Sequence, residues 1–415
     1  MAEEKKTNAK IINSEDARKA KSNKQKRRIR FFTVVIAAVV FLIVVIGMLT
    51  GGYEAFLDCV GIARNVELRP VGVELPCPVG AVSICKATKD TIVIYDENGV
   101  TGYSPDGVWK WNTQCSFANP VLQSYNNFAL LTDIGGHLIW AFDTDGIAWK
   151  YNFDNKVTGV FLSRDEKILY VIHDTADFLS AVSEIPVDSI SKGEPRIRYT
   201  RKFVSYHSLC VAQNSQQVVV TGMYTDVSTI VGTVCFLKSS DGSEYATQIF
   251  DGEMFVKAFF TENNSLFLAN SDKLLLLRKS ITASSDNDIE KVVWAREGKP
   301  QELVDITTLG KKYCVVVYRK ANNDTEDNIS EVIYYNSDGQ QEYKFGINGS
   351  IQGIISNDST ICLYTDRFVY MFDNKARLVG KYESDFEVTD ISYISNTKLL
   401  VQGDSKIACV SYEEE

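Results

Sequence analysis

Three histidines and two acidic stretches hold the side chains most able to do chemistry in this sequence. His137, His173 and His207 could bind one metal ion only if the fold brought them together around it. They fall at different places in the repeating pattern described below, and we interpret them as separate histidines. Carboxylates at residues 322–330 and 382–390 could form the acid–base pair of a glycosidase. Because the sequence gives no distance between them, we interpret both stretches as solvated acidic loops.

Nine cysteines could supply thiol chemistry or disulfides: Cys59, Cys77, Cys85, Cys115, Cys210, Cys235, Cys314, Cys362 and Cys409. None belongs to a Cys-x-x-Cys pair, and most lie in apolar alternating runs, which is typical of buried small hydrophobic residues. One or two disulfides remain open, because spacing does not determine pairing. The sequence also lacks a G-x-S-x-G elbow, an H-E-x-x-H motif, a Walker loop and an EF-hand loop. We therefore predict no catalytic residue, no metal ligand, no cofactor and no enzymatic activity.

Charge is distributed unevenly along the 415 residues. Residues 1–30 carry eleven Lys and Arg against four Asp and Glu, whereas the remaining residues carry 33 basic and 49 acidic side chains. The part after residue 30 is therefore strongly acidic and would repel nucleic acid phosphates. We exclude nucleic acid as a partner.

An uncharged apolar run follows the basic region directly. Residues 31–49 read FFTVVIAAVVFLIVVIGML, and a helix of this length is about 28 Å long, close to the thickness of a bilayer core. The basic tail at 1–30, expected to be disordered, marks the cytoplasmic side. We predict a single-pass signal-anchor at 31–49, a linker at 50–64 and an extracytoplasmic domain at 65–415. The segment after residue 49 offers no A-x-A cleavage site.

The residues after the anchor repeat one pattern. Short runs rich in Val, Ile, Leu, Phe and Tyr alternate with Gly, Asn, Asp and Ser, which is typical of strands and turns. Asp-Gly pairs recur at Asp106-Gly107, Asp145-Gly146, Asp241-Gly242 and Asp338-Gly339, with gaps of 39, 96 and 97 residues. The pairs suit two-residue hairpin turns. Since the last two gaps are each about twice 48 residues, the spacing predicts a repeat of propeller-blade length.

Each repeat divides into four strands, with the Asp-Gly turn between the third and the fourth. Aromatic residues after the turn are expected to pack between neighbouring blades: Trp109, Trp111, Trp149, Tyr151, Tyr343 and Phe345. Seven complete units fit between residues 79 and 383, and three further strands follow. The spare strand at 65–75 would supply the missing fourth strand and close the ring. We therefore predict an all-β, eight-bladed propeller; a seven-bladed ring and two β-sandwiches are the alternatives.

The segment GGHLIWAFDTDGIAWKY resembles the repeat of quinoprotein-like (PQQ-like) propellers. In that repeat a Gly opens the third strand, Ala-x-Asp ends it, and Gly and then Trp follow; the matching residues are Gly136, Ala141, Asp143, Gly146 and Trp149. The segment around Asp106, Gly107 and Trp109 matches in part. The whole layout also resembles uncharacterised membrane-anchored propeller proteins of Gram-positive bacteria, which carry a domain of unknown function. Quinoprotein dehydrogenases use an adjacent Cys-Cys pair against their cofactor, and this sequence has none, so the cofactor is not supported.

These patterns favour a non-enzymatic binding or scaffold module for a protein or a cell-wall ligand. The alternative is an extracytoplasmic enzyme, either a quinoprotein-like oxidoreductase or a carbohydrate-active hydrolase, and a central funnel of converging carboxylates would favour it. The strand that follows the anchor should enter at the face of the Asp-Gly turns, so that this face points toward the membrane. We expect partners on the opposite face, where the longer loops around 173–178, 222–229 and 319–330 should lie. Asp324, Glu326 and Asp327 are the candidate partner-facing residues.

Overall fold

The structure is a computed structural model in which Asn65–Glu415 forms a compact unit of its own, separate from Met1–Arg64. It describes residues 68–70, 75–76, 84–125, 127–163, 165–192, 196–271, 273–278, 290–295, 301–320, 329–404 and 406–411. The predicted tail, anchor and linker lie outside these residues. Within them, none of the helices has the length and apolar character needed to cross a membrane.

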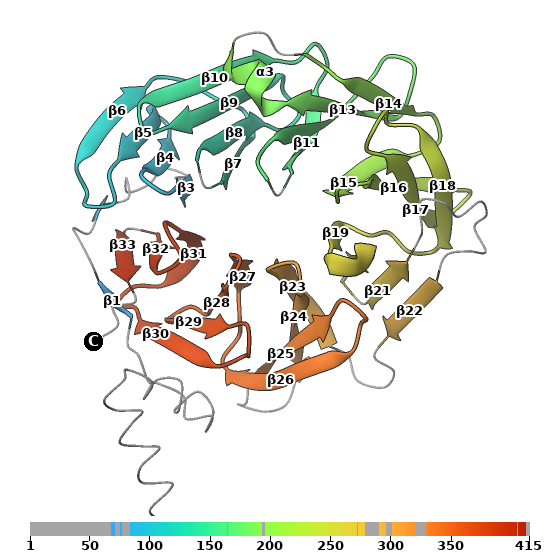
Figure 1. Cartoon of the computed structure of the whole chain (residues 1–415). Coiled ribbons are helices and arrows are strands. Elements are labelled where there is room, and N and C mark those ends of the chain that lie inside the picture. Colours follow the sequence, from blue (N-terminus) through green and yellow to red (C-terminus); the bar gives the residue numbers. More distant parts are fainter. Residues whose placement is uncertain are drawn as a thin grey trace, which may run out of the picture. The chain divides into compact units, whose positions relative to one another are not determined.

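Antiparallel sheets, which we call blades 1 to 8, follow one another around a ring (Figure 1); blades 1 to 7 have four strands each, and blade 8 has five. Blades 1 and 2 comprise β3 (Ile84–Ala87), β4 (Ile92–Asp96), β5 (Gly99–Tyr103), β6 (Trp109–Thr113), β7 (Pro120–Ser124), β8 (Ala129–Asp133), β9 (Leu138–Asp143) and β10 (Gly146–Asn152). Blades 3 and 4 comprise β11 (Val157–Leu162), β12 (Ile168–His173), β13 (Ser180–Pro186), β14 (Tyr199–Phe203), β15 (His207–Gln213), β16 (Gln217–Asp226), β17 (Thr229–Lys238) and β18 (Glu244–Asp251).

The remaining blades repeat this arrangement. Blades 5 and 6 comprise β19 (Lys257–Phe260), β20 (Ser265–Ala269), β21 (Lys273–Arg278), β22 (Glu290–Ala295), β23 (Gln301–Leu309), β24 (Tyr313–Lys320), β25 (Ile329–Asn336) and β26 (Gln341–Asn348). Blade 7 comprises β27 (Gly353–Ser356), β28 (Thr360–Tyr364), β29 (Phe368–Asp373) and β30 (Leu378–Glu383). Two short helical turns, α3 (Val187–Ser191) and η1 (Glu262–Asn264), lie in connections between strands.

Blade 8 joins the two ends of the propeller. Its strands from the C-terminal part are β31 (Val388–Tyr393), β32 (Lys398–Gly403) and β33 (Lys406–Ser411). β1 (Arg69–Pro70) and β2 (Leu75–Pro76) both pair with β33, and the spare strand expected at 65–75 thus takes the form of two short pieces. The all-β, eight-bladed propeller is therefore confirmed, and the seven-bladed and sandwich alternatives are wrong.

Burial explains the run of apolar residues in the second strand of each blade. Neighbouring blades cover both faces of β4, whose five residues are all buried, and β12 is buried at every position after the first. A strand covered on both faces reads as continuous apolar sequence rather than as alternation. The outermost strands behave differently, since exposed and covered residues alternate along β26. The ring thus needs a sequence that is apolar inside each blade and mixed at its rim.

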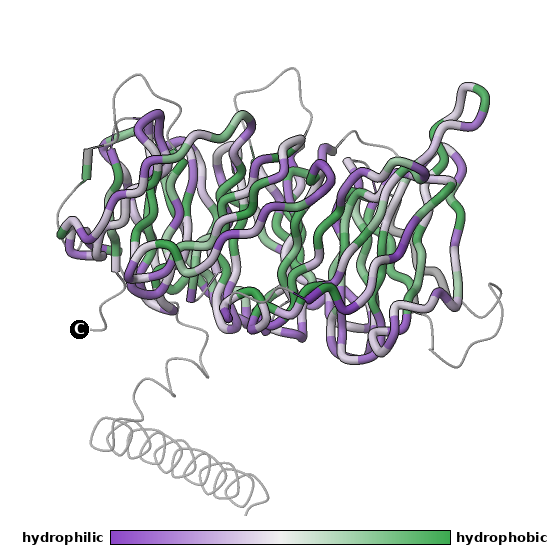
Figure 2. Tube along the Cα trace, turned by 90° about the horizontal axis from the view of Figure 1, so that it is seen from above, coloured by the Kyte–Doolittle hydropathy of each residue, from purple (hydrophilic) through white to green (hydrophobic). Residues whose placement is uncertain are grey.

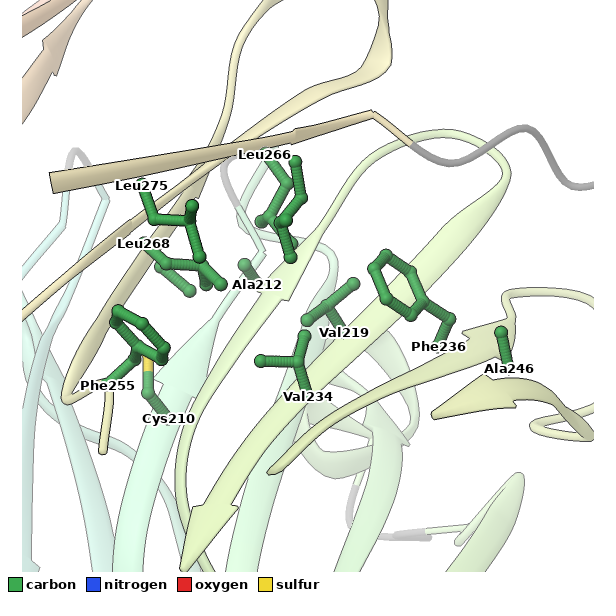
Figure 3. Close-up of a cluster of buried hydrophobic side chains, with 12 residues drawn as sticks. Cys210, Ala212, Val219, Val234, Phe236, Ala246, Phe255, Leu266, Leu268 and Leu275 are labelled. Atoms are coloured by element: carbon green, nitrogen blue, oxygen red, sulfur yellow. The ribbon is translucent and has the colours of Figure 1, made fainter. Parts of the chain in front are cut away.

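Apolar side chains fill the space between consecutive blades. Figure 3 shows one such cluster, in which Val219 and Phe236 of blade 4 meet Leu266, Leu268 and Leu275 of blade 5. Burying surface of this kind stabilises the ring by about 25 cal/mol per Å². Because each blade has two apolar faces, only a neighbour on each side removes both from water.

The expected aromatic contacts between blades are present at most positions. Trp111 of blade 1 stacks on Phe142 of blade 2, with ring centroids 5.5 Å apart, and Phe345 of blade 6 packs on Phe372 of blade 7. Trp149 is buried between blades 2 and 3. The expectation is wrong for Trp109, which is 59% exposed because it lies at the outer end of its hairpin.

Each Asp-Gly pair lies between the third and fourth strands of its blade. The glycines at 107, 146, 242 and 339 adopt positive φ angles between 69° and 115°, a backbone region that glycine enters without steric cost. Ala141 and Asp143 lie in β9, and Gly136 lies in the turn before it. The resemblance-defining residues are therefore turn and packing positions of blade 2.

The connections between strands divide into two faces of the ring. We call the face with the third-to-fourth turns the hairpin face, and the face with the second-to-third and blade-to-blade connections the crossover face. β1 begins opposite Ser411, at the hairpin face. The loops around 173–178 and 222–229 lie on the crossover face as expected, because each joins the second strand of its blade to the third. The 187–198 connection, which contains α3, joins β13 to β14 and lies on the hairpin face.

Candidate functional site

The candidate loop residues Asp324, Glu326 and Asp327 lie outside the described residues. Of the two flanking strands, β24 ends at the crossover face and β25 begins there. The acidic stretch at 382–390 is resolved into the end of β30, a short connection and the start of β31. In this stretch Asp385 pairs with Lys406 of β33, and Asp390 pairs with Lys86 of blade 1.

The three histidines occupy separate positions. His137 Nδ1 lies 2.9 Å from the carbonyl oxygen of Phe153 in blade 2, whereas His207 is exposed at the start of β15. His173 is buried at the end of β12. In the described part of the chain, His, Cys, Asp and Glu side chains form no cluster of three or more that could hold a metal ion.

Seven of the nine cysteines lie in the described residues, and all seven are free thiols. Burial raises the pKa of Cys210 and of Cys362 to about 12, and that of Cys409 to about 11. The thiolate is the nucleophilic form of cysteine, so these thiols are poorly suited to react at neutral pH. They serve as small apolar residues between blades.

Two lysine–aspartate pairs join the innermost strands of neighbouring blades. Lys86 pairs with Asp390 between blades 1 and 8, and Lys257 pairs with Asp305 between blades 5 and 6. Burial, followed by the charges of Asp390 and Asp305, raises the pKa of Tyr364 to about 12, so both carboxylates lie near one phenol. Each carboxylate is already engaged by a lysine, and the two pairs connect blades of the ring.

A pocket of about 370 Å³ opens between blades 2 and 3. Blade 2 contributes Tyr151 and Phe153, followed by the connection with Asp154 and Asn155. Blade 3 contributes the end of β12, the 174–179 connection and residues of β13 and β14. Its volume lies at the lower end of the range for small-ligand sites.

One wall of this pocket is a buried polar chain. His173 Nε2 lies 2.9 Å from Ser183 Oγ, which lies 2.8 Å from Thr200 Oγ1, and His173 Nδ1 lies 2.9 Å from the carbonyl oxygen of Asp174. Desolvation lowers the pKa of His173 below its ordinary value of 6.5, which favours the neutral ring. The arrangement looks like a serine–histidine pair, but Ser183 has no exposed surface for a substrate to reach. These hydrogen bonds therefore fix the positions of the side chains in the pocket wall.

Exposed apolar side chains gather on the crossover face of blades 3 and 4 and the connection to blade 5. We call this set the apolar surface: Leu179, Val204, Val227, Ile230, Ile249, Met254 and Val256. Its members come from several connections. Leu179 N donates to Phe203 O in blade 3, and Gly252 N donates to Ile230 O beside blade 4. Clustered exposed apolar residues mark interaction sites more often than scattered ones.

The β16–β17 hairpin carries the most prominent member of the apolar surface. β16 pairs with β17 as far as Asp226 and Thr229, beyond the last pairs that either strand makes with β15 or β18. The hairpin rises above the ring at the right of Figure 2. At its tip Val227 is 99% exposed and has a φ of 52°, a conformation that β-branched residues rarely adopt. Such strain concentrates at functional positions.

Reasoning from sequence placed the 222–229 loop on the crossover face but missed the apolar surface and the pocket. The tip sequence TDVST has a valine where a tight hairpin turn normally has Gly or Asn, and this departure was the available signal. The pocket left no such signal, because its lining comes from separate strands of two blades.

The family model described as "Family of unknown function (DUF5711)" matches residues 79–411, and the chain belongs to this family. The search of curated proteins gave no match. Among solved structures, BamB from Moraxella catarrhalis is similar, with 12% identity, a TM-score of 0.50 and coverage of 83% of this chain and 100% of that chain. The quinohemoprotein alcohol dehydrogenase ADHIIG from Pseudomonas putida HK5 has 8% identity, a TM-score of 0.50 and coverage of 85% and 77%. At these identities the likeness shows the fold alone, and it confirms the similarity to PQQ-like propellers.

Proposed function

We propose that this member of the DUF5711 family is a membrane-tethered, extracytoplasmic propeller that docks a protein partner on its crossover face and performs no catalysis. The observation that carries the proposal is the apolar surface, which collects most of the strongly exposed large apolar side chains of the described residues on one side of the ring. Exposed apolar side chains of this kind contribute to binding when a partner removes them from water.

The path of the chain supports the orientation of this surface. β1 begins at the hairpin face, next to Ser411, so the described part of the propeller starts on that side. If residues 31–49 cross the bilayer, the hairpin face is directed toward the membrane. The crossover face is then free for partners outside the cell.

The propeller scaffold supports presentation of a fixed surface. The connections that carry Leu179, Val204 and Val227 begin and end on strands that are paired in closed sheets. A rigid scaffold lowers the entropy that a loop loses when it binds.

The proposal is tested with the full-length protein purified from solubilised membranes through a C-terminal tag. Val204→Asp and Val227→Asp place charge in the apolar surface, whereas Val108→Asp changes a 64%-exposed valine on the hairpin face. We expect proteins that co-purify with the wild type and with Val108→Asp to be lost with the other two variants. Identical co-purifying proteins for all three variants, with unchanged thermal unfolding, would contradict docking on this face.

A further inference from the structure

We propose that the pocket between blades 2 and 3 binds one ring of a neutral sugar. The inference goes beyond protein docking, because the pocket and the apolar surface use different side chains. A volume of about 370 Å³ suits a ligand of roughly one or two small rings.

Aromatic rings form the apolar side of the pocket. Phe153 is buried and packs edge-on against Tyr151, with centroids 5.2 Å apart, and lies 4.8 Å from the ring of His173. Tyr151 also lines the pocket. The negative face of an aromatic ring attracts the polarised C–H groups on the flat side of a sugar ring.

Polar side chains at the mouth have unused hydrogen-bonding capacity. Within the described residues, the side chains of Asp154, Asn155 and Asp177 make no hydrogen bond or ion pair, although all three line the pocket. Carboxylate and amide oxygens accept hydrogen bonds from hydroxyl groups, and the amide also donates. Such groups on both sides of one pocket match a ligand with several hydroxyl groups.

The charged side chains of the pocket limit the chemical class of ligand that it can bind. Asp154 and Asp177 place two carboxylates in the lining, and Lys202 supplies one ammonium group, which lies 4.9 Å from the ring of Phe178. A phosphate or carboxylate ligand would be repelled by the acidic pair. A neutral ring with hydroxyl groups can bind the carboxylates and the lysine together without a charge penalty.

The pocket wall is already ordered before a ligand arrives. Thr175 Oγ1 donates to the carbonyl oxygen of Phe178 and accepts from its N–H, each at 2.9 Å, which closes the 174–179 connection on itself. The hydrogen bonds that link His173, Ser183 and Thr200 hold another part of the lining in place. A pre-formed site loses less conformational entropy on binding.

The test measures binding of methyl β-D-glucopyranoside and of N-acetylglucosamine to the full-length protein by saturation-transfer NMR, in a detergent without a sugar headgroup. We expect saturable binding of at least one of them, with a dissociation constant of about 1 mM, which is usual for a ligand of this size. Asp154→Ala and Asp177→Ala should each weaken it about tenfold, because each removes a charged acceptor. Asp366→Ala, an exposed aspartate on the crossover face of blade 7, is the matched control and should change it less than twofold.

Two results would overturn the inference. One is the lack of saturable binding of either sugar, and the other is binding that both pocket variants retain at full strength. Val227→Asp separates this site from the docking surface, since it should abolish protein docking and leave sugar binding unchanged. If only protein docking or only sugar binding is absent, the result therefore shows which of the two proposals has failed.

Discussion

Leu75 of β2 lies directly opposite Ile407 of β33, and both side chains are buried in the same cluster. The first and last strands of the propeller therefore share one sheet. Leu68, just before β1, is buried against Gly380 of blade 7, and its N–H donates to the carbonyl oxygen of Lys381 over 2.8 Å. The N-terminal segment thus connects blades 7 and 8.

Truncating Leu68 should weaken this closure. Leu68→Ala is expected to lower the free energy of unfolding by about 2–5 kcal/mol, because it removes a fully buried side chain and leaves a cavity. Urea unfolding followed by tryptophan fluorescence measures the change. Leu179→Ala, at a 40%-exposed leucine, is the matched control and should cost less than about 1 kcal/mol. Equal effects of the two substitutions would show that the N-terminal segment is dispensable for the ring.

The buried histidine makes stability depend on pH. Burial lowers the pKa of His173 in the folded state below the ordinary 6.5 of an unfolded chain. The unfolded state therefore binds the proton first, and the free energy of unfolding should fall as the pH drops below about 6.5. It should stop falling once the pH is below the pKa of the folded state.

Replacing the histidine isolates this contribution. His173→Gln cannot take up the proton, so its free energy of unfolding should fall less than that of the wild type between pH 7.5 and pH 5. Chemical unfolding at several pH values measures both slopes. Identical slopes for the two proteins would mean that His173 is not held neutral by its surroundings.

Val227 should show a conflict between stability and binding. Asparagine adopts a φ near 52° more readily than valine, so Val227→Asn should raise the free energy of unfolding by up to about 1 kcal/mol. The same change removes an exposed apolar side chain and should weaken docking. Calorimetry and co-purification test the two effects. A variant that is less stable and still docks would contradict the role assigned to the hairpin tip.

The membrane orientation has its own test. An epitope tag after Glu415 should be digested by protease added to intact cells, whereas a tag before Met1 should be protected until the cells are lysed. This result follows from the uncharged run at 31–49 and the basic residues before it. Digestion of the N-terminal tag alone would reverse the proposed topology.

Local chemistry made much of the fold predictable from sequence. The Asp145-Gly146 turn is readable because only a few residue pairs suit a two-residue hairpin, and Trp149 after it is readable as a packing residue. The closing strand near Leu75 followed from counting strands. The ends of individual strands and the exposure of Trp109 depend on tertiary contacts, so they could not be predicted from the sequence.

The candidate sites were much less predictable than the fold. The pocket brings Asp154 of one blade next to Asp177 and Lys202 of another, and no spacing in the sequence records that meeting. The apolar surface likewise depends on which valines the strands leave uncovered. Val204 and Val220 look alike in sequence, but one is 67% exposed and the other fully buried.

The central claim, docking of a protein on the crossover face, is tested most directly by a photo-reactive amino acid at position 227 of the full-length protein in intact cells. The matched control carries the same group at position 108, where an exposed valine lies in a turn on the hairpin face. The account predicts a discrete cross-linked product at 227 that is missing at 108. Equal cross-linking at both positions, or a discrete product at 108 alone, would contradict it.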